Sequence, residues 1–187
     1  MATSERPVIL AVADTASSLP DTFLVRQATP ADAEALAVLG RTVGSEAEGW
    51  LITDRTWRST SDERRYLKSL RRYAHAAVFV AEAPEGIVGR LSIARDPHPA
   101  SSHVADLGLM VAAGRRRQGV GTALMAEATK WALAAGVRKL ELHVFPHNEA
   151  AIALYEKLGW RREGYRKEHY RRGDGYVDAI LMARDLN

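Results

Sequence analysis

A basic, glycine-containing turn is the segment of this sequence best suited to chemistry. An apolar run from Leu109 to Val111 passes into a turn with glycines at positions 114, 119 and 121, and a helical pattern follows. Such a turn directs free backbone N–H groups toward one point, and the dipole of the helix adds positive potential there. The turn is suited to bind a pyrophosphate. The residues expected to bind it are Arg116, Arg117, Gln118, Gly119, Val120, Gly121 and Thr122.

Two other types of phosphate-binding loop do not fit this turn. Gly114 and Gly119 have the separation of a Walker A loop, but residues 120–122 read Val-Gly-Thr where that motif needs Lys and then Ser or Thr. A dinucleotide-binding fingerprint needs a third Gly or Ala three positions after Gly121, where Leu124 stands. The sequence therefore argues against both sites at this turn.

The pattern that fits is Arg116-x-x-Gly119-x-Gly121. It resembles the signature Gln/Arg-x-x-Gly-x-Gly/Ala of the GNAT acetyltransferases, which lies between the fourth strand of that family and the next helix. The resemblance extends over residues 23–186 in the same order of elements. It implies the GNAT fold, acetyl-CoA as cosubstrate and acetyl transfer to an amine.

A second segment, residues 144–160, is similar to the family motif Asn-x-x-Ala-x-x-x-Tyr-x-x-x-Gly-Phe, with Trp160 in place of the final Phe. The resemblance implies that Asn148 contacts the pantetheine arm of acetyl-CoA. It also implies that Tyr155 contacts the cosubstrate and donates a proton to the departing thiolate. Tyr155 shares a helix face with Ile152, so a second interpretation makes it a core aromatic residue.

The third segment, residues 103–111, matches the family's fourth strand. In the family this strand diverges from the fifth, so the resemblance implies that backbone groups around Met110 and Val111 bind the pantetheine amides and polarise the thioester carbonyl. Asp106 stands where many relatives carry Glu, and a carboxylate beside the amine would take its proton directly or through a water. Two alternatives stay open, with Asp106 as a sheet-edge charge or hydrogen-bond anchor, or His103 as the base.

These residues need a sheet and helices to bring them together. The apolar patterns predict the order β-α-α-β-β-β-α-β-α-β-β, and the resemblance implies an α/β fold with a mixed, mostly antiparallel central sheet of about seven strands flanked by helices. Thr60 and Glu63 have capping-box spacing at the start of the second helix. The predicted strands are 23–27, 76–83, 87–94, 104–111, 140–144, 161–170 and 176–183, and the predicted helices are 31–43, one beginning at 60, 119–135 and one from the Asn148 cap to 158.

Length and composition indicate the class of protein. The 187 residues match one domain, with residues 1–21 expected as an N-terminal extension and residues 22–187 as the acetyltransferase domain. The apolar run at residues 7–13 is too short for a signal sequence or a membrane helix, and Cys is absent. We therefore expect a cytoplasmic protein with no membrane partner. Residues 8–12 would suit an added strand in a homodimer.

The charge pattern argues against two further kinds of partner. The net charge is +3, and arginine pairs such as Arg64 and Arg65 lack interleaved aromatic residues, so nucleic acid is not expected to bind. His143 and His147 run from a predicted strand into a loop, without the one-face geometry of a helical metal site. We expect no metal.

The sequence thus predicts an enzyme that transfers an acetyl group from acetyl-CoA to a primary amine, such as a small molecule, a polyamine, an amino acid or a protein N-terminus. The absence of Cys removes the common ping-pong nucleophile and favours direct attack in a ternary complex. The alternative is a non-catalytic acyl-CoA sensor or interaction domain. The residues expected to shape the amine pocket, together with the last hairpin, are Glu46, Glu48, Trp50, Asp54 and Trp57.

Overall fold

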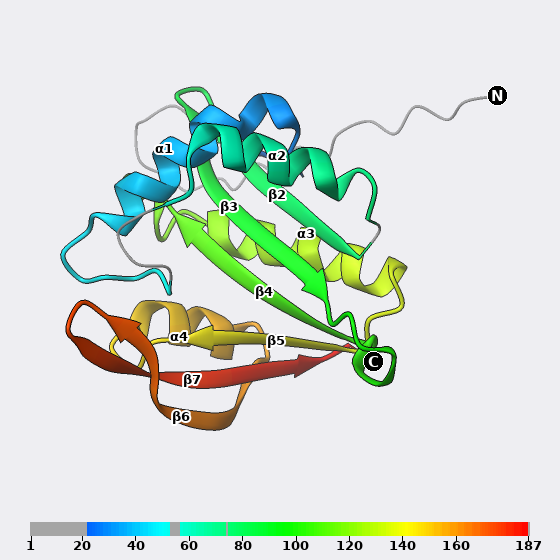
Figure 1. The fold of residues 1–187 in the computed structure, drawn as a ribbon, viewed down its shortest axis with the longest axis vertical. Helices are drawn as coiled ribbons and strands as arrows, with labels where there is room; N and C mark the ends of the chain where they lie inside the picture. The colour runs from blue at the N-terminus through cyan, green and yellow to red at the C-terminus, as the bar shows by residue number, and fades with distance from the viewer. Residues whose placement is uncertain (1–21, 53–56, 74, 187) are drawn as a thin grey trace.

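The computed structural model describes residues 22–52, 57–73 and 75–186. The expected extension over residues 1–21 lies outside these ranges. The described elements follow the predicted order (Figure 1). The strands are β1 (Leu24–Gln27), β2 (Ala76–Ala83), β3 (Gly86–Arg95), β4 (Val104–Val111), β5 (Lys139–Val144), β6 (Arg161–Arg172) and β7 (Gly175–Asp185). The α helices are α1 (Ala33–Gly44), α2 (Thr60–Leu70), α3 (Val120–Ala134) and α4 (Glu149–Lys157).

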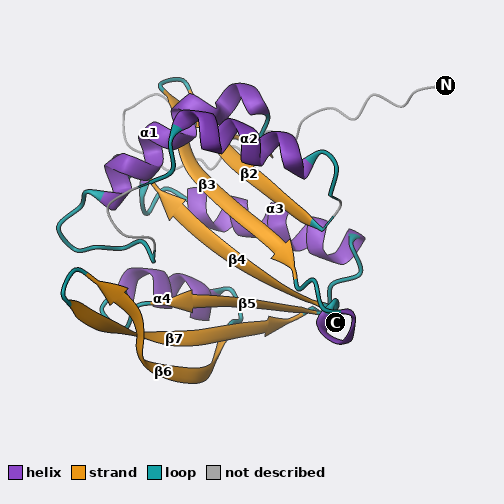
Figure 2. Cartoon of the chain, in the orientation of Figure 1, coloured by secondary structure: helices purple, strands orange, loops and turns teal. Residues whose placement is uncertain are grey.

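The described strands form one sheet in the order β1-β2-β3-β4-β5-β7-β6 (Figure 2). Its neighbouring strands are antiparallel except for β4 and β5. These two are joined by a connection that contains α3, because parallel neighbours need a crossover of this kind. The predicted mixed, mostly antiparallel sheet is therefore confirmed.

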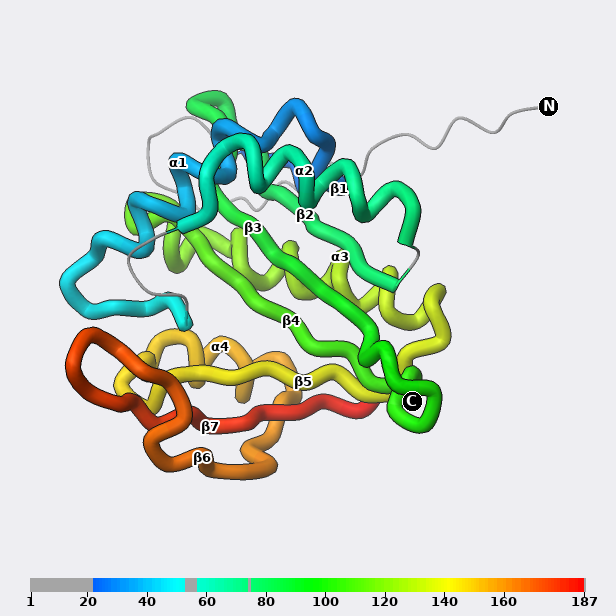
Figure 3. The backbone as a smooth tube through the Cα atoms, viewed as in Figure 1, coloured from blue at the N-terminus to red at the C-terminus, as the bar shows by residue number. Residues whose placement is uncertain are grey.

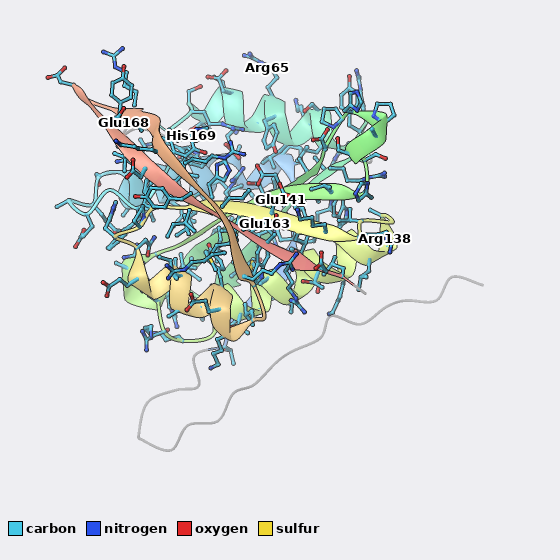
Figure 4. The ribbon with its side chains drawn as sticks, turned by 90° about the horizontal axis from the view of Figure 1, so that it is seen from below. Arg65, Arg138, Glu141, Glu163, Glu168 and His169 are labelled. Carbon is cyan, nitrogen blue, oxygen red and sulfur yellow. The ribbon has the colours of Figure 1, made fainter. Side chains whose placement is uncertain are left out.

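Helices cover both faces of the sheet, as Figure 4 shows from below. The main core lies on the face covered by α3 and α4, where the α3 residues Leu124 and Ala128 are fully buried. Their spacing of four residues places both side chains on one side of the helix. A second cluster, with Leu36 of α1 and Leu67 of α2, covers the other face over β2. The sheet therefore separates two helical layers.

Helix caps agree with the sequence patterns at one site and differ at another. Asn148 caps α4 as expected, because its Oδ1 accepts a hydrogen bond from Ala151 N at 3.2 Å. The predicted cap of α2 is wrong. The helix begins at Thr60, but Ser59 is the cap and its Oγ accepts from Asp62 N at 3.2 Å. Ser59 has the extended backbone that a cap requires, whereas Thr60 is already helical.

Gly89 of β3 lets the first turn of α3 pack closely on the sheet, and this contact yields a test. A Cβ at Gly89 would lie 2.8 Å from Val120 Cγ1 and 2.9 Å from Leu124 Cδ1. We expect Gly89→Ala to lower the free energy of unfolding by about 1–3 kcal/mol through overpacking, as measured by urea titration. Gly114→Ala is the control, because a Cβ there would meet nothing within 4 Å. Equal stability of the two variants would contradict this packing.

Candidate active site

β4 and β5 pair over a short stretch and then diverge. The parallel register joins residues 104–106 to residues 139–141. β4 continues to Val111 and β5 to Val144, and Figure 1 shows the strands separating toward these ends. A cavity of about 390 Å³ opens here, and both strands line it. The strands therefore have the divergence that the family resemblance implies.

The hydrogen-bond register decides which backbone groups of β4 face this gap. Ala112 N donates to Val88 O at 2.8 Å, and Asp96 N donates to Val104 O at 2.9 Å. Even-numbered residues of β4, Met110 included, therefore bond to β3, and odd-numbered residues direct their N–H and C=O groups toward β5.

Three odd-numbered residues, Leu107, Leu109 and Val111, lie beyond the last β4–β5 pair and line the cavity. Met110 contributes its buried side chain to the lining instead. The residue types alone do not identify Leu109, because backbone direction follows from strand pairing.

The glycine-containing turn has the backbone of an anion-binding loop. Arg117 and Gly119 both have left-handed backbone conformations, with φ of 66° and 83°. α3 begins directly afterwards at Val120, so the free N–H groups of its first turn lie beside the loop. Gly121 lines the cavity, and a Cβ there would lie 3.0 Å from Leu154 Cδ2. A ligand chain can therefore pass close to the backbone at this point.

The arginines of the turn have different partners. Arg116 donates to Glu46 Oε1 at 2.7 Å and to Val111 O at 3.1 Å, so it joins the turn to the loop after α1. Arg115 donates to both carboxylate oxygens of Glu85, at 2.6 and 2.9 Å, and joins the turn to the β2–β3 hairpin. Both bridges hold the turn in place beside the cavity.

The remaining side chains predicted for this turn lie at its surface. Gln118 donates from Nε2 to Gly114 O at 3.0 Å, which closes the turn. Arg117 and Thr122 are exposed. Arg117 is thus accessible to a pyrophosphate that approaches from solvent.

Asn148 and Tyr155 line the cavity from α4. Because the Asn148 carbonyl oxygen accepts the cap bond, its amide N–H groups remain to donate to a ligand. Tyr155 is buried, with its ring centroid 5.9 Å from that of Trp160. Burial raises the pKa of Tyr155 above its ordinary value. Tyr155 is thus a core aromatic that also presents a protonated phenol to the cavity.

The two proposed bases of the sequence analysis lie away from the cavity lining. Asp106 is exposed at the point where the β4–β5 pairing ends. The surrounding protein and the negative charge of Glu141 raise the pKa of Asp106. His103 precedes β4 at the paired end of the gap, where its carbonyl accepts from Arg138 N and Lys139 N. Figure 4 shows Arg138 at one end of β5 and Glu141 nearer its middle.

The opposite wall of the cavity holds a buried charged cluster that sequence reasoning missed. Arg90 of β3 and Arg58 before α2 both line the cavity. The fully buried Glu63 carboxylate lies 3.6 Å from Arg90 Nη2 and 3.6 Å from Arg58 Nε. These distances are too long for hydrogen bonds. A single Arg inside the apolar strand run 87–94 is the sequence signal that would have identified Arg90.

Aromatic rings surround this cluster. The Arg90 guanidinium lies 5.3 Å from the Trp57 ring centroid, and the Arg58 guanidinium lies 4.5 Å from that of Tyr66. Gly40 of α1 makes room for the indole, because a Cβ there would lie 2.2 Å from it. Trp50 and Trp57 line the cavity as expected. The expected residue Asp54 lies outside the described residues.

The tip of the last hairpin packs against residues beside the cavity. Figure 3 shows the β6–β7 turn beside the loop after α1. Gly49 of that loop has a φ of 66°, and a Cβ there would lie 2.7 Å from Arg172 Nη1. The Arg172 guanidinium lies 5.1 Å from the Phe145 ring centroid, and Phe145 lines the cavity. Among the described residues, none of the β6–β7 hairpin lines the cavity, and the hairpin reaches it through contacts such as that of Arg172 with Phe145.

Neither a metal site nor a membrane-spanning helix is found among the described residues. No group of three or more His, Asp or Glu side chains within residues 22–52, 57–73 and 75–186 has an arrangement that would hold a metal ion. None of the helices in these ranges has the length and apolar character needed to cross a membrane.

The family model for the GNAT acetyltransferases matches residues 46–160. The chain belongs to the GNAT acetyltransferase family. This GNAT chain is 33% identical over 173 residues to L-amino acid N-acetyltransferase AaaT of Escherichia coli K12, an alignment that covers 87% of this chain and 97% of the relative.

Solved GNAT structures have the same architecture. The GNAT-family acetyltransferase of Streptococcus pneumoniae superposes with a TM-score of 0.80 at 27% identity, over 88% of this chain and 99% of that one. The phosphinothricin acetyltransferase of Sinorhizobium meliloti, crystallised with acetyl-CoA, has a TM-score of 0.77 at 20% identity, over 88% and 89% of the two chains. The predicted family and fold are confirmed, and this GNAT protein is an acetyl-CoA-dependent N-acetyltransferase.

The turn before α3 can be tested by backbone strain alone. Any L side chain at Gly119 is strained by its φ of 83° and would disturb the N–H groups of the turn. We expect Gly119→Ala to weaken acetyl-CoA binding at least about tenfold in calorimetry, which corresponds to about 1.4 kcal/mol. Gly136→Ala is the matched control, because Gly136 has a φ of 75° at the other end of α3. If both variants bind acetyl-CoA equally, the turn does not hold the cosubstrate.

Proposed function

We propose that this N-acetyltransferase acts on the α-amino group of a free amino acid. The supporting observation is the charge of the cavity. Within the described residues, the charged side chains that line it are Arg58, Arg90 and Arg116, and no carboxylate lines it. Arg116 is paired with Glu46 at 2.7 Å, whereas Arg58 and Arg90 share the single carboxylate of Glu63. The acceptor side of the cavity therefore carries an excess positive charge.

A buried excess charge favours an anionic ligand. The Arg90 side chain is 6% exposed, and its Nε has no hydrogen-bond partner among the described residues. Desolvation of a charge costs several kcal/mol unless a partner compensates it. An α-carboxylate matches the two-donor fork of a guanidinium, and its charge would balance the cluster. We assign Arg90 as the principal carboxylate-binding residue, with Arg58 beside it.

The possible acceptors differ in the charge that they carry near the amine. A free amino acid carries its carboxylate one carbon from the amine. A protein N-terminus has a neutral amide at that position, and a polyamine adds further positive charge that the arginines would repel. The 33% identity to an L-amino acid N-acetyltransferase over most of both chains supports the same choice.

The residues of the gap then have separate roles in the transfer. We assign the turn from Arg116 to Thr122 to the pyrophosphate and the Asn148 amide to the pantetheine arm. Acetyl-CoA supplies the acetyl group as an activated thioester. The N–H groups of Leu109 and Val111 stabilise the negative charge that develops on the carbonyl oxygen. Tyr155 donates a proton to the sulfur as it leaves, and transfer is direct because the chain has no Cys nucleophile.

The carboxylate assignment predicts a specific selectivity. Thiol release with acetyl-CoA should be faster for each L-amino acid than for its α-amide, which keeps the amine and side chain but lacks the charge. Loss of one partner of a buried charge pair costs about 2–5 kcal/mol, so we expect at least about a 30-fold lower kcat/KM for the amides. Spermidine and a peptide with a free N-terminus complete the panel. Turnover of amides or spermidine at the amino-acid rate would contradict the assignment.

Variants of Arg90 test the same idea from the protein side. Arg90→Lys keeps the charge but loses the fork, so kcat/KM should fall for amino acids and change little for their amides. Because Arg90→Met alone would leave Glu63 unpaired in the core, the double variant Arg90→Met/Glu63→Gln removes both charges and guards against unfolding. Equal losses for acids and amides, in variants with unchanged thermal stability, would exclude carboxylate binding.

Tyr155→Phe tests the role of the phenol. The ring still packs against Trp160, so stability and both KM values should hardly change, while kcat falls about 10²- to 10⁴-fold. Tyr73→Phe, which removes a hydroxyl from a tyrosine that is 60% exposed, is the control. Retention of more than half of kcat in Tyr155→Phe would make this residue a packing residue only.

A further inference from the structure

The attacking amine must lose a proton, and few side chains in the cavity are able to take one. An α-ammonium group has a pKa of about 8, so most acceptor molecules arrive protonated at neutral pH. Asp106 and His103 are both exposed and do not line the cavity. Apart from arginines, the titratable side chains that line it within the described ranges are Tyr66, Tyr155 and His143. Of these, the imidazole alone changes charge near neutral pH.

His143 lies on the correct side of the gap to meet the amine. In the parallel register Asp106 of β4 is beside Glu141 of β5, so Gly108 and His143 are the next residues on that same face of the two strands. Both line the cavity. The backbone of Leu109, assigned to the thioester carbonyl, directly follows Gly108. The imidazole therefore lies across the gap from the carbon that the amine attacks.

One nitrogen of the imidazole is held by the last hairpin. His143 Nδ1 lies 2.5 Å from the Tyr170 hydroxyl on β6. When Nδ1–H donates to that oxygen, the lone pair of Nε2 is left to accept a proton. Nε2 has no hydrogen-bond partner among the described residues. The hairpin thus fixes both the ring and its basic nitrogen.

We propose that His143 accepts the proton of the attacking amine through Nε2, and that Tyr170 is the positioning residue that holds Nδ1. The inference rests on N-acetyl transfer as such and holds for any acceptor amine. His143 would then be a base that lines the cavity, whereas Asp106 lies at the exposed edge of the cavity.

The charges around His143 keep the ring neutral before the reaction. Burial lowers the pKa of His143, and the neighbouring Arg166 and His169 on β6 lower it further. Glu141 on its own strand opposes this shift. On β4, the facing titratable group is Asp106. Figure 4 shows His169 and Glu141 on their two strands. The neutral imidazole is therefore the main form of His143 near neutral pH.

The proton balance of the step is complete. Only the neutral amine has a lone pair, so the acceptor first loses its ammonium proton to water. As the nitrogen bonds to the carbonyl carbon, the C=O π electrons move to oxygen, the nitrogen becomes positively charged and its N–H groups become more acidic than those of the free ammonium ion. One N–H bond breaks, its electron pair stays on nitrogen and its proton moves to His143 Nε2. The C–S bond breaks with its electrons on sulfur, which takes the Tyr155 proton. The imidazolium afterwards releases its proton to solvent at the open edge of the cavity, and Tyr155 regains one.

A purely structural alternative makes His143 a tether for the β6–β7 hairpin. The variant His143→Asn separates the two roles, because its side-chain amide can still bond to the Tyr170 hydroxyl but cannot accept a proton. We expect kcat to fall about 10²- to 10⁴-fold with both KM values nearly constant. The fall of kcat at low pH, which reports the protonation of the base in the ternary complex, forms the acidic limb of the plot of kcat against pH. This limb should also disappear.

Two further variants should move that limb in opposite directions. Tyr170→Phe removes the group that stabilises the imidazolium, so the limb should shift to lower pH with a smaller loss of kcat. His169→Gln removes a neighbouring group that lowers the pKa of His143, so the limb should shift to higher pH while kcat stays within about twofold. A tether that only supports the fold would change thermal stability and KM without these shifts.

The assays use acetyl-CoA and the fastest acceptor of the panel, whichever class it belongs to. Failure of the amino-acid proposal would thus appear in the panel and leave this test intact. If His143→Asn keeps more than half of kcat and its acidic limb, the proposal is wrong. If the limb instead disappears in Asp106→Asn and persists in His143→Asn, Asp106 is the base. Loss of the limb in His143→Asn with its persistence in Asp106→Asn supports His143.

Discussion

The early end of the β4–β5 ladder is the constraint on which the site depends. Backbone N–H and C=O groups inside a protein need partners, and the two strands part after residues 106 and 141. The N–H groups of Leu109 and Val111 that face the gap are therefore available to an extended ligand, whereas Val111 O already accepts from Arg116 Nε. Because both strands run in the same direction, the helices that follow them begin at the same edge of the sheet. The turn before α3 and the Asn148 cap of α4 are thus brought to the two sides of one opening.

The gap also joins the two layers of the domain. On the side of α3 and α4 the cavity meets Gly121 and Tyr155, which suit the cosubstrate. On the side of α1 and α2 it meets Arg90 and the aromatic residues around it, which suit the acceptor. The ion pair between Arg116 and Glu46 connects the turn before α3 to the loop after α1. This ion pair therefore joins the side of the cavity that suits the cosubstrate to the side that suits the acceptor.

Local patterns in the sequence were sufficient for the order of the elements, the glycine-containing turn and the Asn148 cap. Strand and helix periodicity, the glycine-containing turn and the Asn148 cap all depend on residues close together in the chain, and the structure has each of them. The buried arginine cluster and the backbone groups that face the gap were not predicted in the same way. Arg90 and Glu63 come from different elements, and the direction of the Leu109 backbone follows from the strand register. These features depend on pairing and packing between distant segments, and the single Arg in the apolar run 87–94 is the one local signal among them.

The environments of Tyr155 and His143 shift two pKa values in opposite directions, and this separation supports the two proposed roles. Burial raises the pKa of Tyr155, which keeps the phenol protonated. Burial and neighbouring basic side chains lower the pKa of His143, which keeps the imidazole neutral. In the proposed mechanism the group with the raised pKa serves as acid and the group with the lowered pKa serves as base over the interval between the two values. Burial beside one cavity therefore maintains both protonation states that the proposed transfer needs.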